Sequence, residues 1–93
     1  MTAVVRIPTP LRKIAGGLDQ VKITSAKVNG MITELESKYP GIKERLVDNT
    51  GELHRFVNIY VNGEDVRFMS GLDTAIKEGD EVSIVPAVAG GTD

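Results

Sequence analysis

The carboxyl end of the chain carries the residues with the clearest chemical meaning. An apolar strand pattern gives way there to small residues and a double glycine, Gly90 and Gly91, shortly before the end. Such a segment buries too little apolar surface to order itself, so we expect residues 88–93 to form a mobile, extended arm. Because glycine lacks a Cβ, the arm can thread a narrow channel and present a reactive carbonyl. The pattern predicts a tail for insertion into a partner, with Val88, Ala89 and Gly90 as the threading residues.

Length, charge and composition exclude several classes of function. The chain has 93 residues, which is room for one small core. Its 11 Lys and Arg do not exceed its 13 Asp and Glu, so we expect no nucleic-acid binding. Without cysteine and with one histidine, we expect neither a disulfide nor a metal site. No apolar run approaches membrane-spanning length and the amino end lacks a signal-peptide pattern, so we expect a soluble, cytoplasmic protein.

The amino-terminal part predicts a β-hairpin. Alternating apolar residues over 3–7 indicate a strand, which the prolines at positions 8 and 10 end. A connector over 11–17 leads to a second alternation around Val21 and Ile23. Gly16 and Gly17 in the connector could cradle a phosphate, but the Lys-Ser/Thr of a P-loop is missing, so a simple turn is favoured.

A helix is predicted next, because apolar residues recur at helical spacing along one stripe: Val28, Met31, Ile32, Leu35 and Tyr39. Gly30 lies within this pattern, and we interpret it as a point of close packing against the sheet. Pro40 and Gly41 end the helix. Residues 42–47 can add one more helical turn, and 48–51 form a loop.

The second half predicts further strands. Residues 56–61 alternate most clearly, and Asn62 with Gly63 suits a tight turn that requires positive φ. A short antiparallel strand is therefore expected at 66–68, followed by a helical turn at 72–76 and a final strand around Val82 and Ile84. This order predicts an α+β fold, in which one curved sheet wraps over one helix with the last strand beside the first.

The chain resembles the ubiquitin-like sulfur carrier proteins, the family of the molybdopterin synthase small subunit and the thiamine sulfur carrier. The resemblance covers nearly the whole chain and rests on segments 53–62, 64–68, 79–80 and 85–91. Within the family, these segments look most like the carrier of bacterial cysteine synthesis. The resemblance implies a β-grasp domain over residues 1–87, with a mixed sheet of four to five strands over one main helix, and a flexible tail over 88–93.

The resemblance also implies a chemistry for the tail. In this family the carboxylate of the terminal glycine, matched here by Gly91, is adenylated by an E1-like enzyme and converted to a thiocarboxylate. The chain is then the substrate of activation and not an enzyme. It binds no cofactor itself, because the ATP belongs to the activating enzyme. A cysteine synthase-like enzyme is the best-matched sulfur acceptor, while acceptors in the synthesis of methionine or a thiolated metabolite stay open.

Thr92 and Asp93 depart from the family's pattern, in which a ready carrier ends at the second glycine. In this sequence the Gly91 carbonyl is held in a peptide bond and is not available for adenylation. Some family members are trimmed by a zinc-dependent JAMM-type protease, and by analogy we expect cleavage between Gly91 and Thr92. The alternative is that the two residues are never removed.

Other residues allow a functional and an ordinary interpretation. Phe56, Tyr60 and Val85 are expected on the outer face of the sheet, where they suit docking to an enzyme, or form ordinary half-covered surface. His54 stands alone before a strand and is interpreted as a surface or edge histidine. Scattered basic residues are interpreted as solvated surface and not as a steering patch: Arg6, Arg12, Lys13, Lys22 and Arg67.

Two further functions compete with a carrier. The chain could be a permanent, non-catalytic subunit whose tail completes a partner's active site, as in molybdopterin synthase; it would then copurify with one partner through a larger apolar face. It could also be a ubiquitin-like modifier joined to lysines through Gly91, and a protein-linked isopeptide would distinguish that function.

Overall fold

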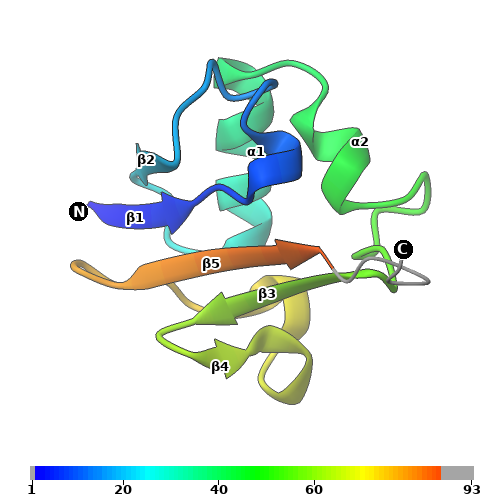
Figure 1. The fold of residues 1–93 in the computed structure, drawn as a ribbon. Helices are drawn as coiled ribbons and strands as arrows, with labels where there is room; N and C mark the ends of the chain where they lie inside the picture. Colours follow the sequence, from blue (N-terminus) through cyan, green and yellow to red (C-terminus); the bar gives the residue numbers. More distant parts are fainter. Residues whose placement is uncertain (1, 87–93) are drawn as a thin grey trace.

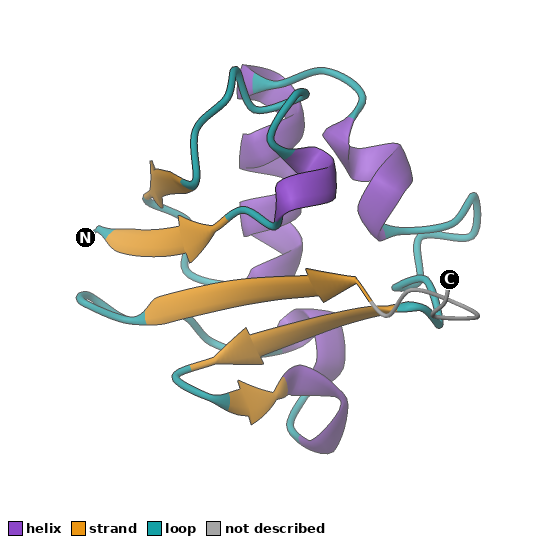
Figure 2. Ribbon diagram, in the orientation of Figure 1, coloured by secondary structure: helices purple, strands orange, loops and turns teal. Residues whose placement is uncertain are grey.

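The computed structural model describes residues 2–86, which fold into one sheet covered by helices (Figures 1 and 2). The strands are β1 (Ala3–Arg6), β2 (Gln20–Ile23), β3 (Val57–Val61), β4 (Glu64–Asp65) and β5 (Glu81–Pro86). The α-helices are α1 (Val28–Lys38) and α2 (Ile42–Leu46), and short 3-10 helices cover Thr9–Leu11, Val66–Phe68 and Gly71–Asp73. No helix within 2–86 has the length and apolar character needed to cross a membrane.

The sheet has the order β2-β1-β5-β3-β4. β1 pairs antiparallel with β2 and parallel with β5, and β5 pairs antiparallel with β3. The predicted hairpin and the predicted placement of the last strand beside the first are therefore confirmed. The mixed five-stranded sheet with one main helix is the β-grasp architecture that the resemblance implied.

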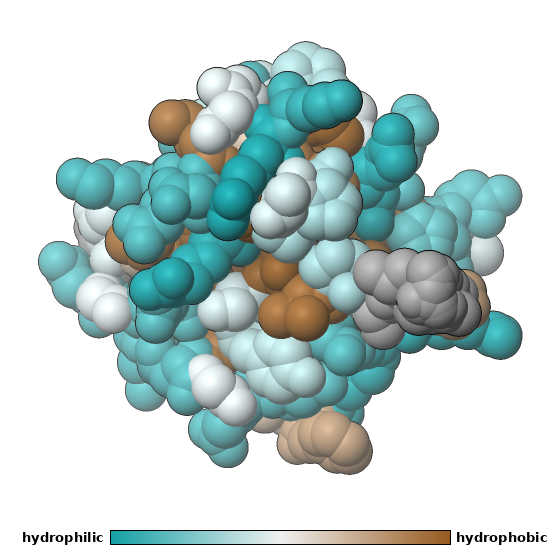
Figure 3. Space-filling model, in the orientation of Figure 1, coloured by the Kyte–Doolittle hydropathy of each residue, from teal (hydrophilic) through white to brown (hydrophobic). Residues whose placement is uncertain are grey.

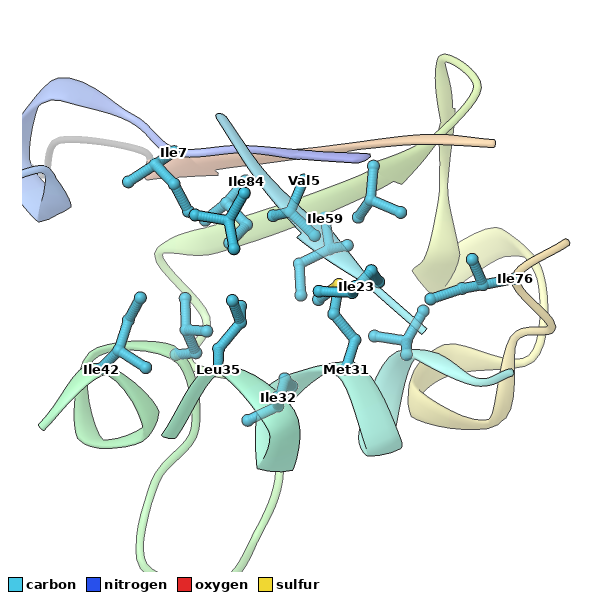
Figure 4. Close-up of a cluster of buried hydrophobic side chains, with 14 of the residues drawn as sticks. Val5, Ile7, Ile23, Met31, Ile32, Leu35, Ile42, Ile59, Ile76 and Ile84 are labelled. Carbon is cyan, nitrogen blue, oxygen red and sulfur yellow. The ribbon is translucent and has the colours of Figure 1, made fainter. Parts of the chain in front are cut away.

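The core lies between α1 and the inner face of the sheet (Figure 4). Met31 and Leu35 of the α1 stripe are fully buried and point toward Val5, Ile59 and other inward residues of the strands (Figure 4). Burying each large apolar side chain contributes about 1.5–3 kcal/mol, so this layer supplies most of the driving force for the fold. The helical stripe and the strand alternation found in the sequence thus meet in one core.

The hairpin between β3 and β4 corrects the predicted return strand. Asn62 (φ 52°) and Gly63 (φ 87°) form the expected turn with positive φ at both positions. The chain pairs with β3 immediately afterwards, at Glu64 and Asp65, and the prediction of a strand at 66–68 is wrong. The strand ends early because the Asp65 carboxylate accepts a hydrogen bond from the Arg67 amide and starts a 3-10 helix.

The interpretation of Gly30 as a point of close packing against the sheet is also wrong. A Cβ built at Gly30 would lie 3.3 Å from the Cβ of Ser25, in the loop after β2, so the close approach is to that loop and not to the sheet. The Ser25 hydroxyl in turn donates to the Glu34 carboxylate at 2.7 Å. Gly30 therefore leaves room for a loop that α1 holds through Glu34.

Candidate functional site

The predicted working part of the chain begins where β5 ends. Ile84 and Pro86 of β5 pair with Ile59 and Val57 of β3, and the opposite edge of β5 pairs with β1. The strand lies close to the middle of the sheet (Figure 1), with residues 81–83 paired to β1 and residues 82–86 paired to β3. Residues 87–93 lie outside the described part of the chain, so the roles of Val88, Ala89, Gly90, Gly91 and Thr92, and the domain boundary at residue 87, stay predictions.

The outer face of the sheet places two of the three docking candidates together. Tyr60 alternates with the buried residues of β3, and Val85 lies opposite Asn58, so both side chains belong to the face turned away from α1. Val85 is 43% exposed, and Phe56, one residue before β3, is 52% exposed. Figure 3 shows a small apolar area near the middle of a largely polar surface over β1, β5 and β3. Docking through these residues stays a prediction.

Arg67 organises the end of the sheet nearest to Phe56. Its Nη1 donates to the Asn58 side-chain oxygen at 2.6 Å, and its Nη2 donates to the His54 carbonyl at 2.7 Å. The guanidinium thereby joins the residues two positions before and two positions after Phe56. In the sequence Arg67 is one of several scattered surface charges, and no local pattern indicates this role, because its partners lie 9 and 13 residues away.

The start of β5 is fixed by a second polar cluster. The side-chain Nδ2 of Asn62 donates to the Asp80 carboxylate at 2.9 Å, and the side-chain Oδ1 of Asn62 accepts from the backbone amide of Glu81 at 3.0 Å. The hydrogen bond from Asn62, together with one from the Lys77 amide, lowers the pKa of Asp80. Glu81 also pairs with Arg6 on β1 and raises the pKa of that guanidinium. The amino end of β5 is thus tied to both neighbouring strands.

His54 occupies a partly covered surface position, as expected. Its Nε2 lies 3.0 Å from the Glu44 carbonyl of α2, beside an open hollow between α2 and the loop at 48–51. Among residues 2–86, no three His, Asp or Glu side chains come together in a way that could hold a metal ion.

The fold and the central C-terminal strand define a small ubiquitin-like β-grasp protein. Residues 5–91 match the ThiS family, and the chain belongs to that family. It is 55% identical over 93 residues to the sulfur carrier protein CysO of Mycobacterium tuberculosis. This alignment covers 98% of this chain and 100% of the relative. It is also 41% identical over 66 residues to the small archaeal modifier protein 3 of Haloferax volcanii, covering 71% of each chain.

A solved structure supports the same assignment. A chain of the Amycolatopsis orientalis BexX/CysO complex is 50% identical and aligns with a TM-score of 0.89, over 95% of this chain and 98% of that one. The relatives are carriers and modifiers by name. The chain is accordingly a carrier-type protein and not an enzyme.

Proposed function

We propose that this chain is a sulfur carrier that holds sulfur as a thiocarboxylate on Gly91. The observation that carries the proposal is the 55% identity to a named sulfur carrier along almost the whole chain. The chemistry explains why a tail is needed. A carboxylate is a poor electrophile, so it first attacks the α-phosphorus of ATP and releases pyrophosphate. Sulfur at the oxidation level of sulfide then attacks the acyl carbon, the C–O bond to AMP breaks, and a proton is lost to leave the thiocarboxylate. The product holds sulfur as a nucleophile without releasing free sulfide.

The proposed partners follow from these steps. An E1-like enzyme supplies ATP and activates Gly91, and a cysteine synthase-like enzyme accepts the sulfur. Phe56, Tyr60 and Val85 are the docking residues that we propose for such enzymes, because Val85 lies one residue before the end of β5, and Phe56 and Tyr60 lie directly before and within the neighbouring strand β3. The A. orientalis complex supports the expectation of a protein partner, since it contains CysO together with a second protein, BexX.

We propose in addition that Thr92 and Asp93 are removed before activation. Their peptide bond occupies the carbonyl carbon that must become the adenylate. A zinc-dependent JAMM-type protease that cuts after Gly91 would expose the carboxylate, and the narrow Gly90 and Gly91 would fit its cleft.

The test is the intact mass of the protein isolated from its own cells under conditions that preserve thioacids. We expect chains that end at Gly91, part of them heavier by the replacement of one oxygen by sulfur. A recombinant chain that ends at Gly91 and has never met the activating enzyme serves as the mass control. If every molecule retains Thr92 and Asp93 and none carries sulfur, the carrier mechanism is wrong and a tail that completes a partner's site is favoured.

A ubiquitin-like modifier is the second candidate, favoured by the identity to the small archaeal modifier protein 3. It predicts an isopeptide between Gly91 and a lysine of another protein. Peptide mass spectrometry of the same cells would detect the branched peptide, and its absence alongside an abundant thiocarboxylate would exclude conjugation as the main use of the tail.

A further inference from the structure

Phe68 is the most exposed large apolar residue in the described part of the chain. Its side chain is 89% exposed, and the following Met69 is 45% exposed. Single exposed apolar residues are common on protein surfaces, so exposure alone decides nothing. What distinguishes Phe68 is the structure that holds it, the segment 66–69, which we call the knuckle.

The knuckle is rigidly built. Val66 is fully buried and fixes the segment to the core. The Asp65 carboxylate accepts from the Arg67 amide at 2.8 Å, and the Met69 amide donates to the Val66 carbonyl at 3.0 Å. The Arg67 side chain adds one bond to Asn58 in β3 and one to the His54 carbonyl just before that strand. Phe68 is therefore presented on a fixed support, which is how aromatic residues act as interface anchors at low entropic cost.

The surroundings of the knuckle are acidic. Residues 48–86 contain eight Asp and Glu against three Lys and Arg, whereas residues 2–27 contain five Lys and Arg against one Asp. Glu64, Asp65 and Asp73 lie next to the knuckle in β4 and in the 3-10 helix Gly71–Asp73, which packs against the helix Val66–Phe68. Of the nearby cations, Arg67 is engaged within the fold, and Lys77 lines a hollow together with Glu64 and Met69, so the acidic residues still outnumber the free positive charge. The surface thus complements a partner with positive charge.

The position of the knuckle suits a partner that also receives the tail. β4 is two strands away from β5 in the sheet, which corresponds to about 10 Å between the strands. An interface of ordinary size, about 800 Å² on each side, covers both places at once. In Figure 1 the segment after β4 lies at the lower edge of the sheet, with β3 between it and β5.

We propose that the knuckle is a second docking surface, in which Phe68 fills an apolar pocket of a partner protein and Lys or Arg side chains around that pocket face Glu64 and Asp73. This proposal rests on the proposed function for the choice of partners, the activating and the sulfur-accepting enzymes. It does not depend on the tail chemistry, because the knuckle contacts the partner whether or not Gly91 carries sulfur. The contact orients the domain while the tail reaches the partner's active site.

Binding titrations of the full chain against each of the two recombinant enzymes test the proposal. Phe68→Ser is compared with Leu18→Ser, which removes another exposed apolar side chain (48% exposed) just before β2, at the opposite edge of the sheet. We expect Phe68→Ser to weaken binding to at least one enzyme about tenfold or more, and Leu18→Ser to change it less than about twofold. Equal thermal midpoints of the variants show that both fold.

A matched pair of charge reversals tests the electrostatic part. Asp73→Lys and Asp19→Lys change the net charge equally, but Asp19 lies before β2, far from the knuckle along the sheet. We expect Asp73→Lys alone to weaken binding at low salt, with a difference that shrinks as salt is added. The proposal is overturned if neither enzyme binds in a Phe68-dependent way, or if the two control variants lose as much affinity. The thiocarboxylate mass reports separately on the proposed function.

Discussion

At the scale of single residues, Arg67 connects parts of the chain that the sequence separates. Its two side-chain hydrogen bonds hold the segment after β4 against Asn58 of β3 and against His54 before that strand, and Phe56 lies between these two residues in the chain. Neither end of this link belongs to the apolar core. Arg67 therefore acts on the arrangement of the exposed surface more than on the stability of the fold.

We predict that Arg67→Ala lowers the free energy of unfolding by about 1 kcal/mol, the usual contribution of a hydrogen-bonding side chain at a surface. Asn58→Ala should lower the free energy of unfolding less in the Arg67→Ala background than in the wild type, because the hydrogen bond between the two side chains is already lost. Urea unfolding of the four proteins in this cycle measures the coupling. Arg55→Ala is the control, since the described residues provide Arg55 with no hydrogen bond or ion pair. Strictly additive effects would contradict the link.

At the scale of elements, side chains of α1 hold β2 and the loop that follows it. The Glu34 carboxylate accepts hydrogen bonds from the amides of Thr24 and Ser25 at 3.0 and 3.1 Å, and Lys38 donates to the Lys22 carbonyl at 3.0 Å. Glu34 and Lys38 also lie 3.5 Å apart as an i,i+4 pair. One carbonyl of the edge strand β2 and two amides just after it are thus bonded within the fold, which leaves fewer backbone groups for pairing with a second chain.

This arrangement predicts a loss of stability in acid. Partial burial raises the pKa of Glu34, but the hydrogen bonds from Ser25 and Thr24 and the charge of Lys38 outweigh it, so the pKa is lowered in the fold. A lowered pKa stabilises the protein above the ordinary value of 4.5 and ceases to do so as the pH falls through the folded value. We expect Glu34→Gln to be less stable than the wild type near neutral pH and to lose less stability on acidification.

The measurement is the urea midpoint of both proteins as the pH is lowered from neutrality through 4.5. Glu44→Gln removes the same charge from an exposed position on α2, where the described residues give the carboxylate no hydrogen bond, and it should follow the wild type. Parallel curves for Glu34→Gln and the wild type would show that the Glu34 hydrogen bonds do not contribute to the pH dependence of stability.

The elements also show what the sequence can and cannot predict. Helix α1 and strands β1, β3 and β5 were predictable because their apolar residues repeat with the periods of a helix and a strand. The strand expected at 66–68 was wrong because a capping bond between Asp65 and Arg67 overrides the local pattern. The Arg67 link and the Glu34 contacts could not be predicted from the sequence. They join residues at least nine positions apart, and only the complete fold brings these residues close together.

At the scale of the whole molecule, the acid–base pattern follows the sheet. The positively charged residues 2–27 form the β2 and β1 side, and the negatively charged residues 48–86 form β3, β4 and β5. Opposite charges meet where the two sides join, at Arg6 and Glu81. A carrier that presents different charge on its two edges can distinguish partners by orientation, because only one way of approach brings complementary edges together.

In the whole protein, the stability of the core and the activation of Gly91 should respond differently to removal of the last two residues. Thr92 and Asp93 are polar and carry little apolar surface to bury, so we expect a chain that stops at Gly91 to unfold at about the same temperature as the chain of 93 residues. The two should differ fully in activation, because only the shorter chain has a free carboxylate on Gly91. ATP–pyrophosphate exchange with the activating enzyme measures this, and a shorter chain with Gly91→Pro controls for the conformation of the last residue. Exchange at equal rates with both lengths would mean that trimming is not required, and that the enzyme recognises a carboxylate other than that of Gly91.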